Sequence, residues 1–208
     1  MNNIKKALEN GQSIWLDSIS RDMIRSGELQ KFIDSGITGV TSNPSIFDKA
    51  IAESDIYDKS LIEYAKDGVN SQIVFERLAV DDIRDAADVL RAVYDGASMR
   101  DGYVSIEVSP ALAADTAGTI TEARRLWAAI DRPNVMIKVP GTPEGVPAIK
   151  TLISEGINVN VTLLFSLDAY TAAANAYIEG LGEFAKAARG IPAGVASVAS
   201  FFVSRVDT

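Results

Sequence analysis

The stretch Asn134-Val135-Met136-Ile137-Lys138-Val139-Pro140-Gly141-Thr142-Pro143-Glu144-Gly145 decides how the rest of the chain is interpreted. It begins as a short apolar run rich in β-branched residues and reaches Pro-Gly, a pattern that predicts a buried strand followed by a loop. Lys138 stands inside this run, although a charged amine is costly to remove from water unless it is paired or neutral. Two explanations are open: an edge strand from which Lys138 reaches water, or an amine in a dry pocket that attacks a carbonyl group.

The composition is that of one globular domain. The chain has 208 residues, of which 47% are apolar, enough for a single hydrophobic core, so we expect one domain over residues 1–208. A formal net charge of −8 disfavours nucleic acid as a partner, because nucleic-acid surfaces need clustered Lys and Arg. No run approaches the roughly 18 apolar residues of a membrane span, and the N-terminus lacks the apolar segment of a signal peptide. We therefore expect no membrane partner and a cytoplasmic location.

The chain contains neither cysteine nor histidine. The absence of cysteine excludes disulfides, thiolate nucleophiles and Cys-ligated metals. The absence of histidine excludes Ser-His-Asp chemistry and most transition-metal sites. An enzyme of this composition has to use lysine, carboxylates, hydroxyls and amides, and we expect no metal.

Short apolar strands alternate with helices along the chain. Strands are predicted in the stretch quoted above and at residues 13–17, 39–43, 103–108, 158–165 and 194–203. Helices are predicted at residues 2–12, 21–35, 44–52, 54–67, 71–95, 120–130, 145–155 and 166–188. The helix at residues 71–95 has one apolar stripe, which consists of Ile73, Val74, Leu78, Ile83, Ala87, Leu90 and Val93. Thr119 or Thr121 is expected to be the N-cap of the helix at residues 120–130. This alternation predicts βα units and a parallel sheet. The chain has neither the glycine fingerprint of a dinucleotide site nor a Walker loop.

Three of the predicted strands have one apolar face and one polar face. The apolar members are Val104, Ile106, Val108, Val135, Ile137, Val139, Val159, Val161 and Leu163. The opposite face carries Ser105, Glu107, Met136, Lys138, Asn158, Asn160 and Thr162. A parallel sheet covered by helices on both sides is apolar on both faces. One polar face instead favours a barrel whose interior holds a polar site near the C-terminal ends of its strands.

Each polar residue also has a purely structural explanation. Asp17 and Asn43 fit turn or helix-cap positions, and Glu107 fits a solvated acid on an edge strand. Asn160 is harder to explain in this way, because Asn is depleted in strands. Thr162 and Ser200, taken alone, are ordinary residues of a strand.

Six motifs, in order, resemble those of bacterial transaldolases. They are Trp-Leu-Asp-Ser-Ile-Ser-Arg (15–21), Gly-Val-Thr-Ser-Asn-Pro-Ser-Ile-Phe (39–47), Val-Ser-Ile-Glu-Val (104–108), Asn-Val-Met-Ile-Lys-Val-Pro-Gly-Thr (134–142), Asn-Val-Asn-Val-Thr-Leu-Leu-Phe-Ser (158–166) and Ser-Val-Ala-Ser-Phe-Phe-Val-Ser-Arg-Val-Asp (197–207). A lone Thr-Ser-Asn-Pro would be a weak signal, whereas six motifs in sequence are specific.

The resemblance implies an α/β fold of the (β/α)8 TIM-barrel type. It also implies transfer of a dihydroxyacetone unit from a ketose phosphate (sedoheptulose 7-phosphate or fructose 6-phosphate) to an aldose phosphate, in the pentose phosphate pathway and without a cofactor. The implied catalytic residues are Lys138 as the Schiff-base nucleophile, Glu107 as a general acid/base acting through a water near Thr162, and Asp17 as the proton carrier at the substrate hydroxyl. The implied binding residues are Asn43, Asn160 and Ser200 for the ketose hydroxyls and Arg205 for the phosphate.

The number of predicted strands departs from the family pattern. An eight-stranded barrel needs about 250 residues, whereas six strands are predicted here, so we expect a barrel truncated after the sixth strand. Open strand edges would favour association of copies. Two alternatives to transaldolase activity stay open. One is a simple aldolase that uses the same Schiff base, and the other is an inactive barrel fragment that oligomerises through its sheet edges.

Overall fold

The computed structural model describes residues 2–187 and 192–203. Contacts divide the chain into two compact units. The first comprises Met1–Ile106 and Ile130–Val135, and the second comprises Glu107–Ala129 and Met136–Thr208. The expectation of a single domain over residues 1–208 stays a prediction.

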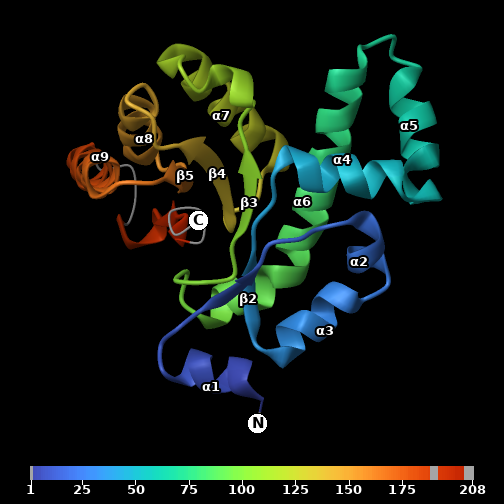
Figure 1. The fold of residues 1–208 in the computed structure, drawn as a ribbon, viewed down its shortest axis with the longest axis horizontal. Helices are drawn as coiled ribbons and strands as arrows, with labels where there is room; N and C mark the ends of the chain where they lie inside the picture. Colours follow the sequence, from blue (N-terminus) through green and yellow to red (C-terminus); the bar gives the residue numbers. More distant parts are fainter. Residues whose placement is uncertain (1, 188–191, 204–208) are drawn as a thin grey trace. The chain divides into compact units, whose positions relative to one another are not determined.

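Six strands follow one another in the sheet in the order β1-β2-β3-β4-β5-β6 (Figure 1). Their bounds are Ile14–Leu16, Ile37–Val40, Val104–Glu107, Val135–Pro140, Val159–Leu164 and Ser197–Phe201. The pairs β1–β2, β2–β3, β4–β5 and β5–β6 are parallel. Parallel strands in sequence order, joined by helices, are the pattern of a (β/α)8 barrel as far as its sixth strand, which confirms the predicted fold class.

The first unit contains, besides β1 and β2, several short helices and one long one. They are α1 (Asn3–Glu9), α2 (Arg21–Arg25), α3 (Glu28–Ser35), α4 (Pro44–Ala52), the 3₁₀ turn η1 (Asp55–Tyr57), α5 (Asp58–Ala65) and α6 (Ser71–Gly96). Several of these helices have an N-cap residue whose side chain accepts a hydrogen bond from a backbone N–H of the first turn. These caps are Asn2, Ser20, Asn43, Ser54 and Asn70.

The helix α6 supplies much of the core of the first unit. Its predicted apolar stripe is buried at Val74, Leu78, Ile83, Ala87 and Leu90, because residues at helical spacing share one face. Ile73 was predicted for the same stripe and is exposed. It directly precedes Val74 and therefore points about 100° away from it.

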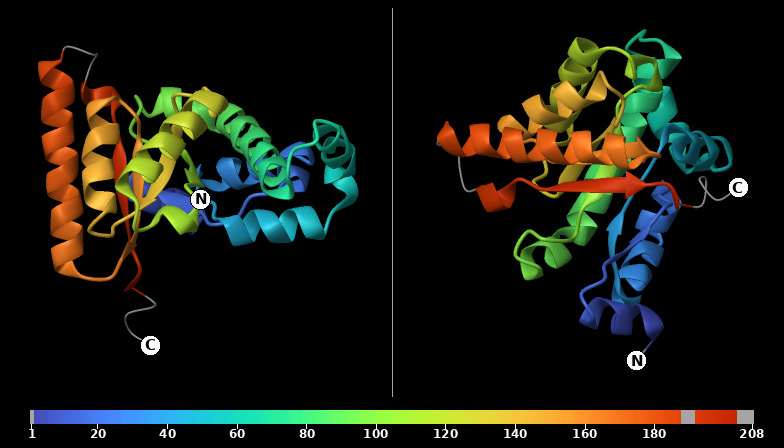
Figure 2. Two further views of the ribbon diagram at one scale, coloured as in Figure 1. Left: turned by 90° about the horizontal axis from the view of Figure 1, so that it is seen from above. Right: turned by 60° about the vertical axis from the view of Figure 1, so that its left-hand side comes forward.

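The second unit contains η2 (Pro110–Leu112), α7 (Thr116–Ile130, whose last residue belongs to the first unit), α8 (Gly145–Ser154), α9 (Leu167–Lys186) and η3 (Pro192–Gly194). The helices α8 and α9 lie side by side (Figure 2). Gly180 of α9 permits this close approach, because a Cβ atom built there would lie 2.5 Å from the carbonyl oxygen of Lys150. Small residues dominate the buried face of α9, which consists of Ala173, Ala176, Gly180 and Phe184.

Several predicted boundaries in the first unit are wrong. The helix expected at residues 21–35 is two helices, because Gly27 adopts the left-handed conformation (φ 75°) between them. The strand expected at residues 39–43 is β2 at Ile37–Val40, since Asn43 is already the N-cap of α4. The helix expected at residues 54–67 is divided into η1 and α5.

Boundaries in the second unit shift for similar local reasons. The helix expected at residues 120–130 begins at Thr116, where Asp115 accepts a hydrogen bond from the Gly118 N–H (2.9 Å). Neither Thr119 nor Thr121 is its N-cap; their hydroxyls donate to backbone carbonyls instead. The last strand begins later than expected, because Pro192–Gly194 form a 3₁₀ turn.

Leu163 departs from the predicted alternation of β5. It was placed on the apolar face with Val159 and Val161, but it is 39% exposed and has φ 60°. The pairing with β6 changes register between Val161 and Leu164. This irregularity, of the kind that a β-bulge produces, exchanges the faces of the last strand residues.

Among the described residues, no helix combines the length and the apolarity needed to cross a bilayer.

Candidate active site

Lys138 lies in an interior strand. All six residues of β4 are buried, and β4 stands between β3 and β5 in the strand order. The Lys138 side chain is only 8% exposed. The explanation of an edge strand from which the amine reaches water is therefore wrong, and the buried amine needs a polar partner.

Glu107 supplies that partner. It is the last residue of β3, and its carboxylate oxygen Oε2 lies 3.3 Å from Lys138 Nζ. The Glu107 side chain is 15% exposed, so it is not the solvated edge acid of the structural alternative. An amine and a mostly buried carboxylate can exchange a proton over this distance, which is the basic requirement of acid–base catalysis.

The neighbouring strand β5 adds amide and hydroxyl groups on the same side of the sheet. Asn160 is the register partner of Lys138, and Thr162 is the register partner of Pro140. Adjacent residues of paired strands project to the same face, so Asn160 faces the same side as Lys138. Asn160 and Thr162 are each 1% exposed.

Ser200 of β6 orients the Asn160 side chain. Its hydroxyl donates to Asn160 Oδ1 over 2.9 Å. This hydrogen bond links β6 to the polar face of β5. The second unit thus gathers the predicted residues Glu107, Lys138, Asn160, Thr162 and Ser200 in one body.

The irregular end of β5 follows directly after this polar group. Leu163 occupies the left-handed region, and the carbonyl oxygen of Thr162 accepts a hydrogen bond from the Gly141 N–H over 2.7 Å. Bulges of this kind often re-aim side chains next to active sites. Thr162 is thus the last residue of the regular part of β5, directly before Leu163.

The predicted residues Asp17 and Asn43 belong to the first unit. Asp17 follows β1 directly and is exposed. Asn43 Oδ1 accepts a hydrogen bond from the Ile46 N–H over 3.1 Å, so Asn43 does serve as a helix cap, as its structural alternative proposed. Arg205 lies outside the described residues.

A buried ionic cluster in the first unit was not predicted. Arg21 Nε donates to Asp82 Oδ1 over 2.7 Å, and the Tyr57 hydroxyl donates to Asp82 Oδ2 over 2.7 Å. Burial raises the pKa of the Asp82 carboxyl, against the hydrogen bonds from Tyr57 and Arg21, which lower it. Burial likewise raises the pKa of Tyr57. The available sequence signal was an aspartate four residues after Leu78, within the apolar stripe of α6.

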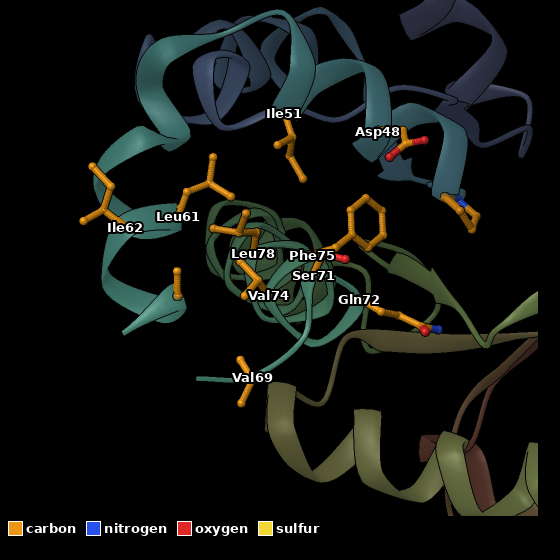
Figure 3. Close-up of a pocket in the computed structure, with 12 residues that line it drawn as sticks. Asp48, Ile51, Leu61, Ile62, Val69, Ser71, Gln72, Val74, Phe75 and Leu78 are labelled. Carbon is orange, nitrogen blue, oxygen red and sulfur yellow. The ribbon is translucent and has the colours of Figure 1, made fainter. Parts of the chain in front are cut away.

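A pocket of about 890 Å³ opens in the first unit among α4, α5 and α6 (Figure 3). Its polar lining residues are Asp48, Ser71 and Gln72. Its apolar walls consist of Pro44, Ile51, Leu61, Ile62, Ala65, Val69, Val74, Phe75 and Leu78. None of these residues is among those predicted for catalysis or substrate binding, so the pocket does not mark the predicted chemistry. In the part of the chain that the structure describes, no group of three or more Asp and Glu side chains is placed to hold a metal ion.

Comparison with known proteins places this geometry in a family context. The family model described as "Transaldolase/Fructose-6-phosphate aldolase" matches residues 14–208. Glu107, Lys138 and Asn160 all lie within the matched residues.

Named relatives agree with the family model. "Transaldolase 2" of Nostoc sp. (strain PCC 7120) is 50% identical over 208 residues, which are 100% of this chain and 54% of that protein. "Transaldolase" of Thiobacillus denitrificans is 50% identical over 209 residues, covering 100% of this chain and 58% of that protein. "Transaldolase" of Trichodesmium erythraeum is 54% identical over 97% of this chain and 53% of its own length. The chain thus spans about half the length of these relatives.

Proposed function

Because this chain belongs to the transaldolase/fructose-6-phosphate aldolase family, we propose that it carries the Schiff-base centre of a dihydroxyacetone transfer between sugar phosphates. The donor is a ketose phosphate, sedoheptulose 7-phosphate or fructose 6-phosphate, and the acceptor is an aldose phosphate. The observation that carries the proposal is the buried pair of Lys138 and Glu107, whose charged atoms lie 3.3 Å apart. The chain spans about half the length of these relatives. That this chain catalyses the transfer by itself is therefore also a proposal.

Lys138 is the nucleophile of the first step. Its amine has to be neutral to attack the ketone carbon, and Glu107 accepts the proton that the ammonium group releases. The attack forms a carbinolamine, and Glu107, through a water near Thr162, returns a proton to the departing hydroxyl. Water leaves and an iminium ion remains, which is a covalent intermediate that needs no metal.

The iminium ion then accepts the electrons of the breaking carbon–carbon bond. Asp17 takes the proton of the hydroxyl next to that bond, an aldose phosphate departs, and an enamine stays on Lys138. The enamine attacks the aldehyde carbon of the acceptor, and Asp17 returns the proton to the new alkoxide. Hydrolysis of the resulting iminium ion releases the product ketose phosphate and regenerates the amine.

The amide and hydroxyl groups orient the bound fragment. Asn160 and Ser200, already joined by a hydrogen bond of 2.9 Å, bind ketose hydroxyls, and Asn43 binds a further one. Buried amides suit this task because their donors and acceptors are fixed before the substrate arrives. Arg205 binds the phosphate, for which a bidentate guanidinium is well suited.

Borohydride trapping tests the proposal. The chain is incubated with fructose 6-phosphate and sodium borohydride, and the products are analysed by intact mass and peptide mapping. We expect a stable adduct on the peptide that contains Lys138, none in Lys138→Arg, and an unchanged adduct in Lys150→Arg. Lys150 is a matched control because it pairs with surface glutamates in the same unit. The absence of an adduct from the unmodified chain, or an adduct that survives Lys138→Arg, would overturn the proposal.

Simple aldol cleavage is the second candidate, because the family description names fructose-6-phosphate aldolase beside transaldolase. The two reactions differ in the fate of the dihydroxyacetone unit. With erythrose 4-phosphate as acceptor, transfer produces sedoheptulose 7-phosphate, whereas simple cleavage releases free dihydroxyacetone. Chromatography of the products distinguishes them.

A further inference from the structure

Arg21 is a buried cation that the proposed reaction does not use. It is 2% exposed and stands at the first position of α2, directly after the loop of residues 17–20 that leaves β1. Burying an arginine is unfavourable unless its charge and its donors are satisfied, and ion pairs of this kind contribute little to net stability. The role of Arg21 is therefore to be found in the segments of the chain that its contacts hold in position.

Arg21 and Asp82 close a ring through Tyr57. The Arg21 backbone N–H donates to the Tyr57 hydroxyl (2.9 Å), which donates to Asp82 Oδ2 (2.7 Å). The Arg21 side chain donates to the other oxygen of the same carboxylate, Oδ1 (2.7 Å). Main chain and side chain of Arg21 are therefore both tied to one carboxylate on α6, which fixes the position of the backbone as well as that of the guanidinium.

Further contacts hold the guanidinium group in one orientation. Its Nη1 donates to the Ser60 hydroxyl of α5 over 2.8 Å, and its carbon Cζ lies 4.6 Å from the centre of the Tyr57 ring. The next residue, Asp22, accepts a hydrogen bond of 2.5 Å from the Ser54 hydroxyl. The start of α2 is thus joined to α5, α6 and η1 at once.

The loop that this cluster anchors contains Asp17. At its beginning, Leu16 is held in β1, where its carbonyl oxygen accepts a hydrogen bond from the Thr41 N–H over 2.9 Å. Ile19, in the middle, is buried, and Ser20 caps α2. Only four residues connect the two fixed ends, so a displacement of Arg21 moves Asp17 directly.

We propose that Arg21 is a positioning residue, and that the Arg21–Asp82–Tyr57 ring holds the β1–α2 loop so that the Asp17 carboxylate has one location. The fixing of the loop stands on the contacts alone, whereas its consequence for proton transfer rests on the proposed function. Arg21 acts through Asp17 and does not touch the substrate.

Arg21→Lys tests the first part. Lysine keeps the charge but cannot donate to Asp82 and Ser60 in the fork geometry of a guanidinium. We expect the ¹⁵N order parameters of Ser18 and Ile19 to fall from about 0.85 to below about 0.6. Leu90→Val is the control, because it removes buried apolar volume from the same helix α6 two turns beyond Asp82 and outside the apolar cluster that contains Tyr57. Tyr57→Phe, which removes one hydroxyl, provides a milder variant if Arg21→Lys does not fold. Unchanged order parameters in the folded ring variant would overturn the proposal.

The second part is measured on the reaction. In Arg21→Lys we expect the borohydride adduct on Lys138 to stay within about twofold of the parent level, while kcat falls at least tenfold and KM changes little. In Leu90→Val, adduct and turnover are both retained. If the parent chain forms no adduct, the proposed function is wrong. The order parameters are then the remaining test of whether the ring fixes the loop. If the loop becomes mobile but kcat is unchanged, the link from Arg21 to Asp17 chemistry is wrong.

Discussion

The Glu107 carboxylate is the charged group that pairs with the Lys138 amine, and its replacement by an amide tests its role at the scale of one residue. Glu107→Gln keeps the shape but removes the proton acceptor 3.3 Å from Nζ. We expect the rate of adduct formation with fructose 6-phosphate to fall by about 10²–10⁴-fold, the usual range for loss of a general acid/base. Rapid quenching with borohydride at successive times measures this rate.

Glu155→Gln is the matched control for that experiment. Glu155 pairs with Arg124 at the surface, so its replacement should leave the rate unchanged. Adduct formation at the parent rate in Glu107→Gln would contradict a proton-transfer role. Loss of the adduct in both variants would point to a general loss of structure.

Single residues were predictable where their type conflicted with their position. Lys138 in an apolar strand and Asn160 in a β-branched run are such conflicts, and both side chains are buried on the face of the sheet that was predicted to be polar. Arg21 raised no such conflict, because an arginine at a helix start is ordinary in sequence. Its burial depends on Asp82, Tyr57 and Ser60, which come from distant elements, and one sequence does not reveal such long-range partners.

At the scale of elements, the packing of α9 on α8 gives a paired prediction. A Cβ atom at Gly180 would lie 2.5 Å from the Lys150 carbonyl oxygen and 3.0 Å from Ile153 Cβ, whereas one at Gly182 would have nothing within 4 Å. Gly180→Ala should therefore lower the free energy of unfolding by about 1–3 kcal/mol, the usual range for overpacking. Gly182→Ala in the same helix should raise it by up to about 1 kcal/mol, since alanine favours the helix.

Urea denaturation of the two variants measures both changes. They share helix, residue type and substitution, so the difference isolates the contact with α8. Equal effects of the two substitutions would show that the two helices separate without cost and would contradict the close packing.

The order and type of most elements were predictable, whereas several boundaries were not. Alternating apolar strands and amphipathic helices sufficed for six strands and for the long helix α6. The errors arose where a local cap or a glycine decided the end, as at Gly27 and Asp115. Leu163 was misplaced for a different reason, because periodicity assumes a regular strand and cannot show where a register shift begins.

At the scale of the whole molecule, an acidic chain of formal net charge −8 should lose stability in acid through identifiable pairs. Hydrogen bonds from the Arg132 guanidinium hold the pKa of the Asp88 carboxyl below its ordinary value. A carboxyl whose pKa is lowered by folding contributes stability above its unfolded pKa and loses that contribution as the pH falls through the folded value. The loss therefore begins as the pH falls below about 4.

Asp88→Asn isolates this contribution. Because both side chains are substantially exposed, solvent screening limits the expected loss at pH 7 to about 0.2–1 kcal/mol. Urea denaturation should show this difference at pH 7 and at low salt, and the difference should shrink in 1 M salt and decrease progressively as the pH falls below about 4. A difference that changes with neither pH nor salt would mean that the substitution acts through packing instead of charge. Association of copies, also a property of the whole molecule, stays a prediction.

The discontinuous first unit has a consequence for the order in which the protein is synthesised. Asn134 is fully buried there, and its side-chain amide donates to the carbonyl oxygens of Ala87 (2.8 Å) and Gly102 (3.0 Å). A ribosome delivers residues 1–106 first, but it has to add the whole of α7 before Asn134 emerges. At about 5–20 residues per second, a nascent chain thus lacks for seconds the buried Asn134 side chain and its two hydrogen bonds to this unit. Chaperones that recognise partly folded nascent chains would have their opportunity in this interval.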